Sequence, residues 1–366
     1  MRRFPGSSAI ASGRGAVFVV DRRPPVLARR IAATGAIVIL VAGCSSTGPD
    51  RVARPTQPTR PAATTQVTTG VTKPLATTSL ARRQIGRITI DNADGLVAAL
   101  GFIWVKTDDG RLVKVDPRTN RIVGQRKLDT ATDSSRYCQG IGTDGKSVWA
   151  CATTDTATDV VQVDPTSLAP VQRVRVNKVF DQLRLPFAGD KLWVLGADGS
   201  SLIGVDPATA AVTTRRLPVR CLQLFGSDGM LLATCRIDNL VLRIEPASGT
   251  VSARRSVASP GFAVTSGTDT WVDTSEGVQR LDPALRTTAV YPGLVVGLDG
   301  DLAVDAAGAI WARQQSGFLL RIDPNRNAVV ERVAAPASLS GGSLLITDDS
   351  IWTTASDDAA LLRLRR

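Results

Sequence analysis

The chain has 366 residues, which is enough for a large core or for two or three domains. Its formal net charge is +11, but residues 1–83 carry 13 basic side chains against two acidic ones, which leaves 31 of each sign from residue 84 onward. A neutral body lacks the basic face that nucleic acid requires, so nucleic acid is excluded as a partner. The chain contains no histidine, so any catalytic role must do without the most common general base and zinc ligand.

Residues 29–43, RRIAATGAIVILVAG, have the pattern of an export signal. A positive pair precedes an apolar run of about 13 residues, which is too short to span a membrane as a helix. The ending Val41-Ala42-Gly43-Cys44 resembles the bacterial lipobox, in which cleavage before the cysteine leaves a thiol for lipidation. The alternative is a chance cysteine after an apolar run. We expect residues 1–43 to be a cleaved lipoprotein signal peptide and Cys44 to anchor the chain to the extracytoplasmic face of the cell membrane.

The segment 44–81 is rich in threonine and proline and contains almost no large apolar side chain. Such a composition cannot bury enough surface to fold. We therefore predict a disordered linker over 44–81 that holds a folded body, residues 82–366, away from the membrane.

From residue 95 onward, one pattern recurs seven times. The second strand of each copy is predicted at FIWVK (102–106), SVWAC (147–151), KLWVL (191–195), MLLAT (230–234), DTWVD (269–273), AIWAR (309–313) and SIWTT (350–354). The third strands are LVKVDP, VVQVDP, LIGVDP, VLRIEP, VQRLDP, LLRIDP and the terminal LLRLRR. The tryptophan positions lie 39–45 residues apart, which is the length of one four-stranded blade. The sequence thus predicts an all-β, seven-bladed β-propeller of four-stranded antiparallel blades.

The seventh copy ends after its third strand, so its fourth strand must come from elsewhere. Residues 84–90, QIGRITI, precede the first copy and match the fourth strands at 171–174 and 330–333. We predict that strand 84–90 pairs with strand 360–366 and closes the ring.

Six tryptophans occupy the same place in the repeat, whereas the fourth copy has Leu232 or Ala233 there. An aromatic ligand box is one interpretation of these side chains. Their fixed place favours the other interpretation, in which each fills the space between two blades.

Four cysteines lie within the repeats. Cys138 and Cys151 flank one Asp-Gly turn, and Cys221 and Cys235 flank another. A hairpin brings such positions side by side, and an oxidising compartment favours their pairing. We predict disulfides 138–151 and 221–235, with a four-cysteine metal site as the alternative.

These repeats, of the form IWV…GLVxVDPxT, resemble the superfamily of the streptogramin (virginiamycin B) lyases and the YVTN-type seven-bladed propellers. The resemblance covers roughly residues 84–366. It implies the propeller fold and, for the lyases, a Mg²⁺-assisted elimination with a histidine base. No position in this chain can supply that histidine, so the catalytic step does not carry over, and propellers serve many functions.

In a propeller, the loops between strands two and three and the connectors between blades gather on one face around the channel. Polar residues predicted there form the candidate ligand face: Asp108, Asp109, Arg136, Arg184, Arg220, Asp238, Asp273, Arg313 and Gln315. The alternative is that aspartates occupy these loops because turns favour them. Carboxylates there could also hold Mg²⁺ or Ca²⁺, although no signature for a cofactor is present.

Two functions remain open from the sequence. The first is a non-catalytic binding or scaffolding module, held at the membrane by its lipid and facing a protein or cell-envelope ligand. The second is a metal-dependent lyase, lactonase or glycan-processing enzyme that uses carboxylates in place of histidine. A quinoprotein-like redox role is discounted because its cofactor-docking repeats are not evident. An acidic ring converging on the channel would favour the enzyme, and a mixed face would favour the binding module.

Overall fold

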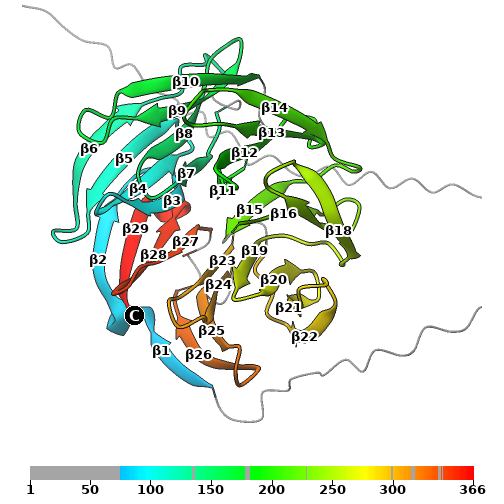
Figure 1. The fold of residues 1–366 in the computed structure, drawn as a ribbon. Coiled ribbons are helices and arrows are strands. Elements are labelled where there is room, and N and C mark those ends of the chain that lie inside the picture. The colour runs from blue at the N-terminus through cyan, green and yellow to red at the C-terminus, as the bar shows by residue number, and fades with distance from the viewer. Residues whose placement is uncertain are drawn as a thin grey trace, which may run out of the picture. The chain divides into compact units, whose positions relative to one another are not determined.

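The computed structural model describes residues 75–133, 137–177, 182–227, 229–297, 300–314, 318–336, 339 and 341–366. These residues form seven sheets arranged in a ring, which confirms the predicted seven-bladed β-propeller (Figure 1). The predicted signal peptide and Cys44 lie outside the described residues. Within each blade, the four main strands are antiparallel to their neighbours and the first of them lies innermost, next to the channel.

The strands of the first four blades follow chain order. Blade 1 contains β3 (Ala93–Ala99), β4 (Phe102–Thr107), β5 (Arg111–Asp116) and β6 (Arg121–Lys127). Blade 2 contains β7 (Ile141–Thr143), β8 (Val148–Thr153), β9 (Thr158–Val163) and β10 (Pro170–Asn177). Blade 3 contains β11 (Phe187–Ala188), β12 (Lys191–Leu195), β13 (Ser201–Val205) and β14 (Val212–Arg216). Blade 4 contains β15 (Gln223–Ser227), β16 (Met230–Cys235), β17 (Leu240–Glu245) and β18 (Thr250–Ser256).

The last three blades include the two ends of the described chain. Blade 5 contains β19 (Ala263–Ser266), β20 (Asp269–Thr274), β21 (Gly277–Leu281) and β22 (Thr287–Pro292). Blade 6 contains β23 (Asp301–Val304), β24 (Ile310–Gln314), β25 (Phe318–Asp323), β26 (Ala328–Ala334) and, on its outer edge, β1 (Ala76–Ser79). Blade 7 contains β27 (Leu344–Ile346), β28 (Ser350–Ala355), β29 (Ala360–Arg365) and β2 (Gln84–Thr89), with a short 3₁₀ helix η2 (Ser356–Asp358) between β28 and β29.

The ring closes as the sequence predicted. Strand β2 pairs antiparallel with β29, and its residues 87–89 face 362–360. Ile88 is buried, whereas its neighbours Arg87 and Thr89 are exposed, as expected for an outer strand with one covered face. Strand β2 therefore supplies the fourth strand of the blade that contains the last strand of the chain.

The predicted linker boundary at residue 81 is wrong by several residues. Residues 76–79 form β1, which runs parallel to β26 on the rim of blade 6, and helix α1 (Leu80–Arg83) joins it to β2 (Figure 1). Leu80 is buried in the core of blades 6 and 7, and Arg83 forms an ion pair with Glu331 of β26. The ordering of this polar stretch comes from pairing with an open sheet edge and from one buried leucine, neither of which its composition reveals.

Each of the six tryptophans is at most 2% exposed and packs against the next blade, as predicted. Trp104 lies in a cluster with blade 2, Trp193 with blade 4, and Trp352 with blade 1. The fourth copy places Leu232 at this position, because Leu232 pairs with Arg243 of β17 as Trp271 pairs with Arg280 of β21.

Lysine and arginine side chains on the third strands form hydrogen bonds to the neighbouring blades. Lys114 donates to the carbonyl of Pro165 at 2.7 Å, and Arg280 donates to that of Pro324 at 3.0 Å. Both acceptors belong to the Asp-Pro turn of the following blade. Arg363 makes the same contact from blade 7 to Pro117 of blade 1 while its guanidinium lies over Trp352. The Asp-Pro signature thus supplies a fixed acceptor for the preceding blade as well as a turn.

Both predicted disulfides are present. Cys138 is bonded to Cys151, and Cys221 is bonded to Cys235. Each bridge ties the connector that enters a blade to that blade's second strand.

Candidate functional site

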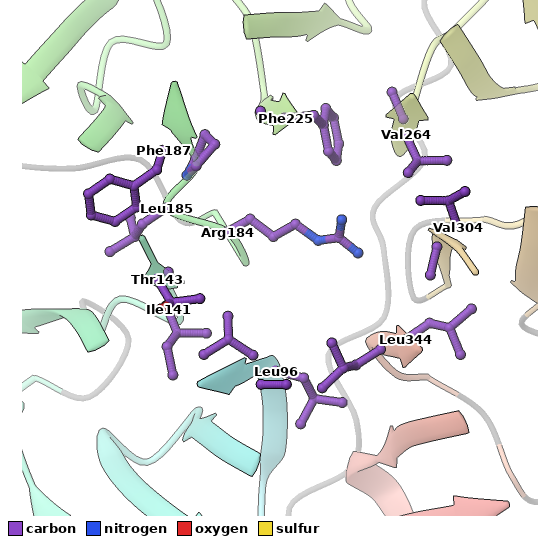
Figure 2. Close-up of a pocket in the computed structure, with 18 of the residues that line it drawn as sticks. Leu96, Ile141, Thr143, Arg184, Leu185, Phe187, Phe225, Val264, Val304 and Leu344 are labelled. Carbon is purple, nitrogen blue, oxygen red and sulfur yellow. The ribbon is translucent and has the colours of Figure 1, made fainter. Parts of the chain in front are cut away.

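The channel at the centre of the ring contains an apolar cavity of about 340 Å³, called here the inner cavity. The first strand of every blade contributes an apolar side chain to its wall, as Figure 2 shows: Leu96, Ile141, Phe187, Phe225, Val264, Val304 and Leu344.

The connector between blades 2 and 3 passes along the channel. Its residues 183 and 185 bond to Ile141 of β7, so this segment extends the inner edge of blade 2. Gly142 allows this contact, because a Cβ atom there would lie 2.0 Å from the carbonyl oxygen of Leu185.

This connector places Arg184 in the channel. The guanidinium extends toward the centre of the ring (Figure 2), and its Nη2 donates to Asp301 Oδ2 at 2.6 Å and to the carbonyl of Leu302 at 3.1 Å. Asp301 begins β23 on blade 6, is 1% exposed, and also accepts the backbone N–H of Leu344 at 2.8 Å. Burial raises the pKa of Asp301, and the charge of Arg184 opposes that rise. The pair links the connector between blades 2 and 3 to blades 6 and 7 across the channel.

A second recess of about 350 Å³ lies where the first strands begin, and we call it the acidic mouth. Its lining residues are Asp94, Asp108, Gln139, Leu183, Gln223, Phe262, Gly300, Gly341, Gly342, Ser356 and Asp357. Residues 183 and 300, which line the mouth, immediately precede Arg184 and Asp301 in the chain. The ion pair therefore lies between the acidic mouth and the inner cavity.

Asp108 is the central acceptor of the acidic mouth. Gln139 donates to its carboxylate at 2.5 Å, and its side chain is also hydrogen-bonded to that of Asp94. Burial raises the pKa of Asp108, against the opposing effect of these two bonds. A hydrogen bond between two carboxyl groups needs one shared proton, and the pair then carries one negative charge. When a cation binds and that proton leaves, the pair carries two negative charges.

Two of the predicted ligand-face residues instead hold blade connectors. Asp273 is buried and accepts the N–H of Val296 at 2.9 Å, and burial raises its pKa to about 6. Arg313 is buried and donates to the carbonyls of Leu339 and Gly341, and burial lowers its pKa to about 10. Both lie two residues after the tryptophan, the position that Cys151 occupies in blade 2.

Of the other predicted residues, Asp108 lies in the acidic mouth and Arg184 lies in the channel. Asp109 turns away from the mouth and pairs with Arg111 at 2.8 Å. Arg220 and Asp238 are exposed and line neither cavity. Arg136 and Gln315 fall outside the described residues.

The residues that sequence reasoning missed share one place in the repeat. Asp94, Gln139 and Gln223 lie nine or ten positions before the tryptophan position of their blades, and the other connector residues at nine to eleven positions complete the ring. Aligning the copies at tryptophan and counting back would have found them. Asp301 was missed because its partner is 117 residues away.

The described ranges contain no group of three or more histidine, cysteine, aspartate or glutamate side chains placed to hold a metal ion. No helix in this part of the chain is long and apolar enough to cross a membrane.

The fold is similar to that of several solved structures. The WD40 domain of Pan2 from Neurospora crassa matches with a TM-score of 0.62 and 11% identity over 77% of this chain and 94% of that one. Virginiamycin B lyase from Staphylococcus aureus matches with a TM-score of 0.62 and 14% identity over 76% and 98%. A streptogramin B lyase matches with a TM-score of 0.60 and 12% identity over 76% and 94%. No family model matches the chain, and no curated protein matches it in sequence.

At these identities the likeness establishes the fold alone, which is the seven-bladed β-propeller.

Proposed function

We propose that this chain is a non-catalytic binding module of the cell envelope, tethered by lipid at Cys44, whose acidic mouth receives a cationic or hydrogen-bond-donating group of a protein or envelope partner. The observation that carries the proposal is the mixed lining of the mouth, in which acceptor groups stand beside apolar side chains. Three carboxyl groups and two amides from blades 1, 2, 4 and 7 surround one recess. Such a wall offers oxygen acceptors to ammonium, guanidinium or hydroxyl groups.

The mixed lining favours recognition over catalysis. Phe262 and Leu183 stand beside the carboxyl groups, and three glycines leave room between the polar side chains. Ligand sites commonly combine apolar surface with a few placed polar groups. The rival function is an enzyme of lyase, lactonase or glycan-processing type, in which the Asp94–Asp108 pair would transfer a proton.

Recovery of partners from membranes tests the binding role. Full-length protein carrying a C-terminal affinity tag would be isolated from gently solubilised membranes, and its co-purifying components identified. Variant D94N/D108N removes two acceptor charges from the mouth. Variant D164N/D206N makes the same charge change at two Asp-Pro turns, where asparagine supports the same turn geometry. We expect the mouth variant to lose the partner and the turn variant to keep it.

A turnover assay separates the two functions. The purified protein would be incubated with Mg²⁺ or Ca²⁺ and with a panel of lactones and glycans. A rate above background that disappears in D94N/D108N would replace the binding role with the enzymatic one.

Membrane attachment has its own test. Variant C44A should shift the protein from the membrane fraction to the soluble extracytoplasmic fraction, and a clickable fatty acid should label the wild type only. Labelling of C44A, or its full retention in membranes, would contradict the lipid anchor.

A further inference from the structure

The inner cavity has the features of a binding site separate from the acidic mouth. Its volume of about 340 Å³ lies within the range of small-molecule pockets, about 300–1,000 Å³. Its wall is the ring of seven apolar side chains, and Arg184 extends among them (Figure 2). An apolar chamber that contains one cation differs in chemistry from the carboxyl-lined mouth.

The ion pair presents its two charges unequally. The Asp301 side chain is 1% exposed, whereas that of Arg184 is 30% exposed. Both hydrogen bonds of the guanidinium to Asp301 and Leu302 use Nη2. Within the described part of the chain, Nε and Nη1 make no hydrogen bond, so these donors remain available to a molecule in the cavity.

A second polar group on the wall lacks a partner. Thr265 of β19 lines the inner cavity and is 6% exposed, and its Oγ1 has no hydrogen-bond partner among the described residues. A buried hydroxyl without a partner carries a desolvation cost that a bound acceptor would remove.

From these features we propose that the inner cavity binds a small amphipathic monoanion, a carboxylate with an aliphatic body. The carboxylate would accept hydrogen bonds from Nε and Nη1 of Arg184, and the chain would lie against the apolar ring. A dianion is disfavoured because the partner charge of Asp301 leaves no net positive charge in the chamber.

Isothermal titration with short fatty acids, kept below their aggregation concentrations, tests this proposal. Hexanoate, heptanoate and octanoate should bind with affinities that rise about fourfold per methylene. Octanoate should bind about tenfold or more tightly than 1-octanol, which has the same chain and no charge. Equal binding of octanoate and octanol, or no binding of either, would overturn the proposal.

Three variants locate the site. R184M/D301N removes both charges, so no buried carboxylate is left without its partner, and it should bind octanoate and octanol equally. A98W fills the cavity from the exposed position of Ala98 on its wall and should abolish binding of both. D94N/D108N alters only the acidic mouth and should bind octanoate as the wild type does. Unchanged octanoate affinity in R184M/D301N would place the molecule elsewhere and refute the assignment.

Discussion

The Nη2 atom of Arg184 lies 2.6 Å from Oδ2 of Asp301, although 117 residues separate them in the chain. This contact joins blade 6 to the connector between blades 2 and 3. Arg184 lines the inner cavity, and residues 183 and 300, which precede the two partners, line the acidic mouth. The same pair is therefore a structural link across the ring and a neighbour of two chemically different recesses.

Replacing one partner of this pair while the other remains should destabilise the folded ring. R184M leaves Asp301 buried without its cation, and removing one partner of a buried pair costs about 3–5 kcal/mol. R184M/D301N should recover most of that loss, since the asparagine can still accept the N–H of Leu344. Urea unfolding of both single variants and the double variant measures the coupling. Additive losses below about 1 kcal/mol would show that the contact does not hold the ring.

Stepwise truncation should reveal which N-terminal element closes the ring. A chain starting at residue 75 should unfold like the full chain, because β1, α1 and β2 all remain. A start at residue 84 removes Leu80 and the Arg83–Glu331 pair and should cost about 2–3 kcal/mol. A start at residue 91 removes β2, exposes the edge of β29 and should abolish cooperative unfolding. Thermal unfolding distinguishes these outcomes, and similar behaviour of all three truncations would contradict the closure.

Asp273 should make stability depend on pH in a direction opposite to that of a paired carboxylate. Its pKa is raised by burial from 3.8 to about 6, so the folded state binds a proton more tightly than the unfolded state. The stabilising effect of that proton is fully present below about pH 3.8 and is lost as the pH rises through about 6.

The uncharged variant D273N isolates this effect. Its stability relative to the wild type should fall as the pH is lowered from 7.5 to 4, by up to about 3 kcal/mol. Denaturant unfolding at several pH values measures the difference. A constant difference across this range would show that Asp273 titrates normally.

Each disulfide should stabilise its blade separately. The loops that they close span 13 and 14 residues, for which about 2–4 kcal/mol per bridge is expected. The double variants C138S/C151S and C221S/C235S should each lower the free energy of unfolding by that amount, and reductant should have the same effect on the wild type. Insensitivity of the wild type to reductant at equilibrium would contradict this account.

The architecture was predictable because each blade repeats the same physical solution. A tryptophan that fills the space between blades, a turn that begins with Asp-Pro and a fixed repeat length are local patterns. Because the seventh copy lacks a fourth strand, the segment at 84–90 was needed to complete that blade. Cysteines on either side of an Asp-Gly turn were likewise paired by hairpin geometry together with the expected oxidising compartment.

The remaining features depend on contacts that a local pattern does not contain. Strand β1 forms by pairing with the edge of blade 6, and nothing in its Thr-rich sequence indicates that pairing. Asp273 and Arg313 looked like exposed loop charges, yet the position two residues after tryptophan points into the blade connectors. Gln139 and Gln223 belong to no motif and share only a place nine or ten positions before the tryptophan position.

Site-specific photo-crosslinking in intact cells tests the central claim most directly. A photoreactive amino acid at the exposed position 357 lies on the wall of the acidic mouth, and one at the exposed position 146, in the turn between β7 and β8, serves as the control. We predict a discrete crosslinked partner from position 357 that is absent from position 146 and is lost when D94N/D108N is added. Equal crosslinking from both positions, or a product that survives D94N/D108N, would contradict the acidic mouth as the binding face.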